Sequence, residues 1–166
     1  MVTASDDARA VVASVRDPEL PALTIDDLGI LGDVSVEHGT VVVAVTPTYS
    51  GCPAMDVIHD DIVSNLRRAG YDEVEVRVQL TPAWSSNRIS AAGRRKLTAA
   101  GIAPPGPAPV PVSPIPITLR PFEQRLPCPR CGSDETEATS RFGATACKSL
   151  HRCRQCGEPF EHFKAL

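Results

Sequence analysis

The start of the chain carries apolar side chains at the spacing of an amphipathic helix. Asp6 and Asp7 lie in its first turn, where negative charge is favoured. Asp17 precedes Pro18, and a residue before proline avoids the helical conformation. The pattern therefore predicts a helix over residues 4–16. Its apolar stripe comprises Ala8, Val11, Val12 and Val15.

Two further helices are predicted from apolar spacing and end signals. One covers residues 54–69, because Pro53 suits the first helical position and Gly70 suits the position after the last turn. The other covers residues 90–100 and is stopped by Gly101. The buried stripe of the longer helix comprises Met55, Ile58, Ile62 and Leu66.

Three strands complete the pattern of this part of the chain. The first lies near residues 34–37, and a turn leads into a β-branched run over residues 40–46 that is typical of a buried strand. Residues 73–80 alternate between apolar and polar side chains, as in a half-buried strand. The order helix-strand-strand-helix-strand-helix predicts a compact α/β (α+β) domain over residues 1–103. The apolar positions of the third strand are Val74, Val76, Val78 and Leu80.

A change of composition marks the end of this domain. Eight of the 16 prolines lie in residues 104–121, and such a density favours an extended linker because proline fixes φ and lacks a backbone donor. We interpret the segment as a spacer. The alternative is a docking strap whose apolar residues lie on a partner or on the first domain. Residues 122–166 then form a second unit with little apolar core.

Charge and composition narrow the functional classes. Apolar residues make up 42% and charged residues 22%, which suits a folded chain, and a net charge of −3 argues against a basic nucleic-acid binder. The polar, acidic start and the lack of a long apolar run predict a cytoplasmic protein with no membrane segment. The six cysteines are then expected to be reduced, which favours metal binding over disulfides.

The second unit contains two C-x-x-C-G motifs. Cys128 and Cys131 form the first, and Cys153 and Cys156 form the second. The two pairs can direct four thiolates at one ion, the tetrahedral ligand set that zinc prefers, and four protein ligands leave no open position for catalysis. The spacing predicts a zinc ribbon with one structural zinc per chain. Disulfides or free thiols are less favoured, and an iron–sulfur cluster on the same thiolates stays open.

Other residues of the second unit are assigned structural roles. Cys147 is expected to be a small buried residue or a substitute ligand, and His151 is expected to point away from the metal. His162 lies between Phe160 and Phe163, which are expected to cover the ribbon. The expected strands cover residues 135–142 and 147–152.

Cys52 is the single cysteine of the first domain. We expect it at the N-terminal cap of the helix over residues 54–69, where unpaired N–H groups and the helix dipole lower the pKa of a thiol. It is therefore a candidate reactive or cluster-contact thiol, and the alternative is a small buried residue that closes the turn. His59 lies two helical turns away, too far to act as its base.

Several motifs of the first domain together resemble the MIP18 family, also called the domain of unknown function 59. The resemblance implies the small α/β fold described above and a link to iron–sulfur cluster assembly. It also implies that Cys52 corresponds to the metal or cluster contact proposed for that family. The motifs are Asp17-Pro18-Glu19, Ile25-Asp26-Asp27-Leu28-Gly29-Ile30, Thr46-Pro47-Thr48-Tyr49-Ser50-Gly51-Cys52-Pro53, Leu80-Thr81-Pro82-Ala83-Trp84-Ser85 and Ile89-Ser90.

Nearly the whole chain resembles the D-type subunits, also called J-type, of bacterial phenylacetyl-CoA epoxidase systems. The resemblance rests on the joining of the two domains and on motifs around Cys128, Phe142 and Cys156. It implies an accessory role in aerobic phenylacetate breakdown, beside a di-iron oxygenase, a structural partner and an iron–sulfur flavoprotein reductase. Maturation of their metal centres is the role that the resemblance implies.

The chain is not expected to be an enzyme by itself. It has no Glu-x-x-His ligands of a di-iron bundle and no flavin or nicotinamide fingerprint. Our first hypothesis is an accessory subunit of the phenylacetyl-CoA monooxygenase that assists assembly of iron–sulfur or di-iron centres, with a transient cluster or iron at Cys52. The alternatives are a protein-interaction subunit whose ribbon docks a partner, and a small thiol enzyme. The expected partners are the other subunits of the system, and a homodimer is left open.

Overall fold

The computed structural model describes residues 4–108 and 126–166, and the chain divides into two compact units, Met1–Lys96 and Leu97–Leu166. Most of the predicted proline-rich linker lies outside the described residues. The first unit contains α1 (Ala4–Ala13), β1 (Leu31–Glu37), β2 (Thr40–Val45), α2 (Ala54–Arg68), β3 (Val74–Val78) and the short 3₁₀ helix η1 (Ser86–Arg88). The helix α3 (Ala91–Ala99) contains the division, and the second unit continues with β4 (Ile102–Ala103), β5 (Thr136–Ser140), β6 (Lys148–Cys153) and β7 (Pro159–Phe163).

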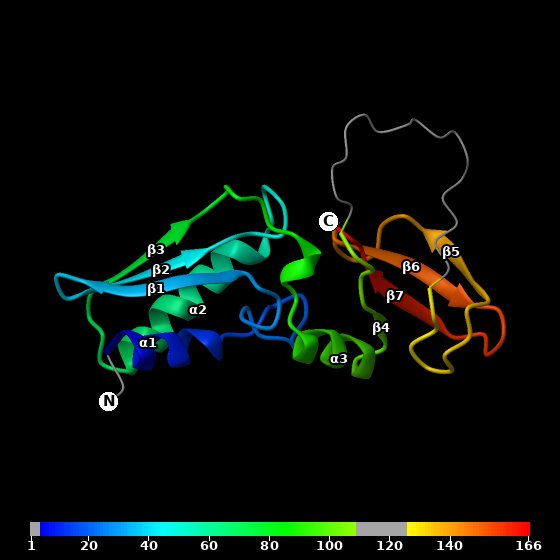
Figure 1. Ribbon diagram of the computed structural model, residues 1–166, viewed down its shortest axis with the longest axis horizontal. Helices are drawn as coiled ribbons and strands as arrows, with labels where there is room; N and C mark the ends of the chain where they lie inside the picture. The colour runs from blue at the N-terminus through cyan, green and yellow to red at the C-terminus, as the bar shows by residue number, and fades with distance from the viewer. Residues whose placement is uncertain (1–3, 109–125) are drawn as a thin grey trace. The chain divides into compact units, whose positions relative to one another are not determined.

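A three-stranded sheet with two helices on one face forms the first unit (Figure 1). The β-branched strand β2 lies in the middle, antiparallel to β1 and parallel to β3, and α2 makes the crossover between the parallel pair. The core side of β2 is fully buried, as a continuous apolar run predicts. The α/β fold expected from the sequence is confirmed. The fully buried side chains include Ala8, Val12, Val41, Val43, Val45, Ile58, Ile62 and Leu66.

The third strand departs from its predicted burial. The expected apolar face extended to Leu80, but β3 ends at Val78, and these two side chains are 60% and 56% exposed. The reason is position, since β3 is the edge strand of its sheet and its last residues have a neighbour on one side only. The prediction of a half-buried strand is therefore wrong at this end.

The second unit is built on a four-stranded sheet in the order β4-β7-β6-β5. The antiparallel pair β5–β6 was expected from the sequence, whereas β7 was not recognised as a strand. Ile102 and Ala103 add β4 to the outer side of β7, so the predicted boundary after residue 103 falls inside the second unit. Phe160 and Phe163 are buried as expected.

A chain of polar side chains joins β6 and β7 in the interior of this sheet. The Ser149 hydroxyl lies 3.0 Å from His151 Nε2 and 3.3 Å from His162 Nδ1. All three residues are buried, and His162 Nε2 has no hydrogen-bond partner within the part of the chain that the structure describes. Burial lowers the pKa of His162 to about 4, and the neighbouring charges of His151 and Lys164 act in the same direction.

A second polar link crosses the opposite side of the same strands. Lys148 donates to Glu161 Oε2 at 2.8 Å, although the lysine side chain is only 6% exposed. Gly143 packs closely against both residues, because a Cβ at this position would lie 3.2 Å from each of them. The loop that precedes β6 therefore covers the ion pair.

We predict that protonation of His162 destabilises the second unit. The pKa of His162 in the folded state lies below the ordinary value of 6.5, so the unfolded chain binds a proton at a higher pH than the folded chain does. The free energy of unfolding should therefore be unaffected above pH 6.5 and should decrease as the pH falls toward 4. Hydrogen exchange of β6 and β7 amides in metal-saturated protein should report a loss of about 1 kcal/mol between pH 7.5 and 5.5. His162→Phe should flatten this slope, and the exposed His59→Asn should not; an unchanged slope in His162→Phe would contradict the assignment.

Candidate metal centre and thiol site

Two turns of the same design carry the four cysteines of the C-x-x-C-G motifs. In the first turn Gly132 N–H donates to Cys128 O at 2.8 Å, and in the second Gly157 N–H donates to Cys153 O at 3.0 Å. Both glycines have positive φ, 75° and 76°, a conformation that other residues rarely adopt. The glycine after each motif therefore allows the backbone to curl under its pair of sulfurs.

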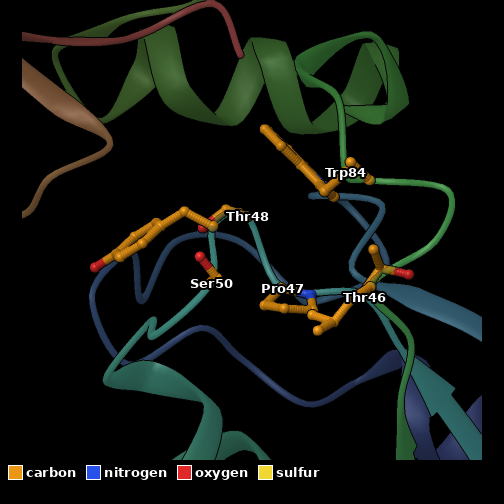
Figure 2. A pocket seen from close by; sticks show the side chains of 8 residues that line it. Thr46, Pro47, Thr48, Ser50 and Trp84 are labelled. Carbon is orange, nitrogen blue, oxygen red and sulfur yellow. The ribbon is translucent and has the colours of Figure 1, made fainter.

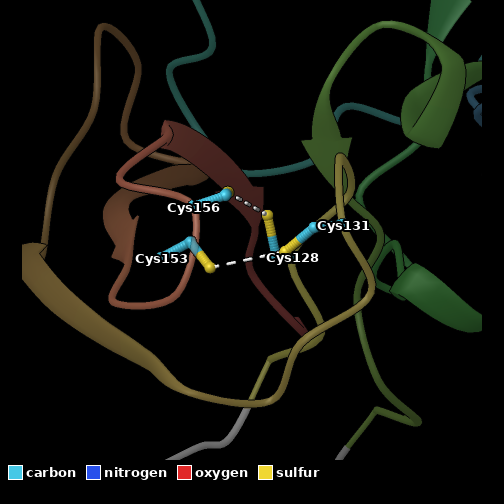
Figure 3. Close-up of side chains that lie close together, drawn as sticks. All are labelled: Cys128, Cys131, Cys153 and Cys156. Carbon is cyan, nitrogen blue, oxygen red and sulfur yellow. Dashed lines mark hydrogen bonds between the residues drawn. The ribbon is translucent and has the colours of Figure 1, made fainter.

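The two turns bring the four sulfur atoms together (Figure 3). All four Sγ atoms lie within 4.8 Å of one another. The separation is 3.8 Å between Cys128 and Cys156, and 3.6 Å between Cys131 and Cys153. A tetrahedral ion with metal–sulfur bonds of about 2.3 Å requires sulfurs about 3.8 Å apart. The donor set therefore fits a single ion, whereas a cluster places several iron and sulfide atoms between its ligands.

The protein environment shifts the pKa values of two of these thiols in opposite directions. The backbone N–H groups of Cys156 and Gln155 donate toward Cys153 and lower its pKa to about 7. At Cys131 the Ser133 N–H acts in the same direction, but burial and the neighbouring thiols outweigh it and raise the pKa to about 12. The Cys131 thiol is therefore held protonated at neutral pH, and a metal ion must displace its proton to bind there.

An arginine within each motif ties it to another part of the second unit. Arg130 pairs with Glu158 at 2.5 Å, and Arg154 pairs with Glu137 at 2.7 Å. The first pair joins one cysteine turn to the other, and the second joins a turn to β5. Both pairs are exposed, so they contribute little to stability, but they hold positive charge beside a thiolate cluster. The sequence shows these arginines, but not which acids they meet.

The remaining candidates of the second unit are not part of the four-sulfur group. Cys147 is buried, with its Sγ 3.0 Å from Thr145 Oγ1. His151 was expected to point away from the metal, but it shares the buried side of β6 with Cys153 and stacks on Phe160. The His151 ring contacts the Ser149 hydroxyl and the Phe160 ring, and the His162 ring contacts the same Ser149 hydroxyl.

The single cysteine of the first unit lies at the start of α2, but in an acidic environment. Pro53 precedes the helix, and Cys52 stands one residue earlier, with its C=O accepting from Met55 N–H at 3.2 Å. Burial raises the pKa of the thiol; the Ala54 N–H and the Thr48 hydroxyl oppose this, while Glu19 and Asp17 reinforce it. The expected lowering of the pKa is therefore wrong, because burial and two carboxylates outweigh the helix end.

A pocket of about 210 Å³ lies beside the loop that leads to Cys52 (Figure 2). Trp84 forms one wall, held by a hydrogen bond from its indole Nε1 to Leu28 O at 3.0 Å. Hydroxyl groups of the loop and apolar side chains share the lining, and the volume is below that of pockets that enclose drug-sized ligands. The lining comprises Thr46, Pro47, Thr48, Tyr49, Ser50, Leu80, Ala83 and Trp84.

Both parts of the chain match known protein families. Residues 5–80 match the family model of an iron–sulfur cluster assembly protein, and residues 113–164 match that of the PaaD zinc beta ribbon domain. The chain is 39% identical over 157 residues to the D-type component of a "Putative 1,2-phenylacetyl-CoA epoxidase" of Escherichia coli, a match that covers 95% of this chain and 90% of the relative. The chain belongs to the family of D-type phenylacetyl-CoA epoxidase subunits.

Relatives of the first unit also occur without the ribbon. An Fe-S protein maturation auxiliary factor of Porphyromonas gingivalis is 31% identical over 87 residues, covering 51% of this chain and 82% of that protein. A crystal structure of a DUF59 domain from Bacillus anthracis has 31% identity and a TM-score of 0.52, covering 56% of this chain and 90% of the domain. The D-type family therefore joins a DUF59 fold to a zinc ribbon domain.

Within residues 4–108 and 126–166, no helix is a candidate for a membrane-spanning segment. Each helix found there is too short or too polar to cross a bilayer.

The first prediction for this site concerns the four-sulfur group. Cys131→Ser removes one ligand, so bound metal should fall well below one ion per chain. Because zinc binding supplies ~10–16 kcal/mol in zinc-finger peptides, loss of one ligand should lower the free energy of unfolding of the second unit by about 3 kcal/mol or more. Limited proteolysis should cut residues 126–166 faster while sparing 4–96, and Cys147→Ala is the matched control. An intact, metal-loaded Cys131→Ser protein would exclude this role.

A separate prediction concerns the thiol of Cys52. Its raised pKa means that, at pH 7, alkylation followed by mass spectrometry should proceed more slowly than for an unperturbed cysteine of equal exposure. Glu19→Gln removes one charge that raises the pKa and should increase the rate about twofold at pH 8, whereas the remote Glu73→Gln should not. A rate that is fast at pH 7 and insensitive to Glu19 would show that the carboxylates do not control the thiol.

Proposed function

We propose that this chain is an accessory, non-catalytic subunit of a multicomponent phenylacetyl-CoA monooxygenase, the ring 1,2-epoxidase of aerobic phenylacetate catabolism. The observation that carries the proposal is the match to the D-type relative over 95% of the chain, together with the presence of both domains in this chain. The partners are the other subunits of that system, and the proposed location is the cytoplasm.

Within this role we propose that the first unit assists assembly of the iron–sulfur or di-iron centres of the partner subunits. The relatedness to an Fe-S protein maturation auxiliary factor supports this assignment. Cys52 offers one thiol flanked by the carboxylates of Asp17 and Glu19 and by the Thr48 hydroxyl. One thiol cannot hold a cluster, so any iron or cluster bound there is cargo, shared with a partner or a second thiol.

We propose zinc as the ion of the second unit. The sulfur separations of 3.6 and 3.8 Å suit zinc, and four thiolates are its usual structural ligands. Cys128, Cys131, Cys153 and Cys156 would hold it with no open coordination position. The ion would therefore stabilise the fold, and the ribbon would present a fixed surface to another subunit.

The variant Cys52→Ala separates the assembly hypothesis from the protein-interaction hypothesis, in which Cys52 is structural. In a strain that grows on phenylacetate, Cys52→Ala should abolish or strongly slow growth if Cys52 serves assembly. The oxygenase or the reductase purified from that strain should be under-loaded with iron, while all subunits are made in normal amounts. Under the interaction hypothesis growth and iron content stay near normal.

Two controls separate these outcomes from loss of folding. Cys147→Ala removes a buried cysteine that lies outside the four-sulfur group and should leave growth unchanged. Circular dichroism and zinc content of the Cys52→Ala protein should match the unaltered chain. Normal growth with fully loaded iron centres in Cys52→Ala would remove the assembly role from this residue and leave the interaction hypothesis.

A further inference from the structure

The open edge of β3 is a feature of the first unit that has no part in the roles proposed above. In the parallel ladder Val41 N–H donates to Glu73 O, and Gln79 N–H donates to Val45 O. Residues 73, 75, 77 and 79 therefore direct their backbone groups at β2. Because backbone groups alternate along a strand, Val74, Val76 and Val78 direct theirs outward. Among the described residues no strand pairs with this edge.

The opposite edge of the same sheet is protected. Ser5 and Arg9 of α1 donate to the carbonyl oxygens of Val34 and Gly32 at 2.7 Å each. The β1–β2 register is also irregular between Leu31 and Val34. Side-chain caps and bulges are the usual means of blocking an edge strand. The pairing of β3 with β2 is regular from Val74 to Val78, with no bulge or proline.

The sequence of β3 is complementary to itself when two copies run antiparallel. With Val76 opposite Val76 of a second copy, the outward N–H and C=O groups of Val74, Val76 and Val78 all find partners. Glu75 then lies opposite Arg77 of the other copy, at positions where the side chains of paired strands approach most closely. A parallel arrangement would set like charges side by side.

Exposed apolar surface lies at the same edge. Val78 is 56% exposed on the side of the sheet that α1 and α2 cover, and the antiparallel register brings it beside Val74 of the second copy. Glu75 and Arg77 lie on the other side and already pair within the strand at 2.8 Å. Pairing of two copies would therefore cover an apolar side chain on one face and extend a charge network on the other.

We propose that β3 is a homodimer interface, in which two chains join edge to edge about a two-fold axis through Val76. The interface is short, so association is weak and concentration-dependent. It is independent of the four-cysteine site and of Cys52.

Charge reversal tests this register directly. Glu75→Arg or Arg77→Glu alone sets like charges opposite each other twice across the two-fold axis, and each should weaken self-association about tenfold or more. An equimolar mixture of the two variants places a positive strand against a negative one, so it should recover a one-to-one heterodimer. Sedimentation velocity and native mass spectrometry of the full-length, metal-loaded chains report both effects.

Two further variants keep the test decisive. Val76→Pro removes an outward N–H that the folded monomer does not use, so the fold should persist while the dimer is lost. Arg95→Glu, an exposed reversal on α3, should leave association unchanged. A chain that stays monomeric at ~1 mM, the weak limit of specific association, would overturn the proposal. A dimer insensitive to Val76→Pro, or reversals not rescued by mixing, would overturn it equally.

Discussion

Bringing four sulfur atoms within bonding distance of one ion is the constraint on which the second unit depends. Few large apolar side chains are available to hold its strands together, so the ends of the sheet must be tied by other means. The two cysteine turns do this by the same backbone device, a glycine with positive φ after each motif. Phe160 then packs against Cys128, Cys153 and Ala103, so the apolar cluster is centred on the sulfurs.

The two kinds of cysteine in the chain are set apart by their electrostatic surroundings. Cys153 receives backbone N–H groups, which stabilise a thiolate, and it is ready to bind a cation. Cys52 also receives an N–H at a helix start, but carboxylates and burial keep it protonated at neutral pH. A thiol with a raised pKa resists oxidation and indiscriminate metal capture, and a cation placed beside Asp17 and Glu19 would favour its ionisation.

Local signals predicted the helices and the central strand because their causes are local. Pro53, Gly70 and the apolar stripe of α2 favour that helix through signals within its own segment, and the C-x-x-C-G spacing indicates which cysteines meet. Burial at an edge and the acids that face Cys52 depend on contacts between distant segments. Glu19 and Cys52 are brought together only by the packing of two loops, and Val78 is exposed only because no described strand follows it in the sheet. A strand as short as β7, rich in charged and aromatic residues, has no periodic signal either.

The ion pair between Lys148 and Glu161 favours one register of the β6–β7 hairpin. A shift of one residue would turn the lysine to the face of β7 that carries His162, and would leave a buried ammonium without its carboxylate. Misaligned hairpins are thereby penalised before any metal arrives. Cys153 and Cys156 sit at the turn of this hairpin, so the correct alignment presents them as a half-formed ligand set. Capture of the ion then needs only the approach of the segment that carries Cys128 and Cys131.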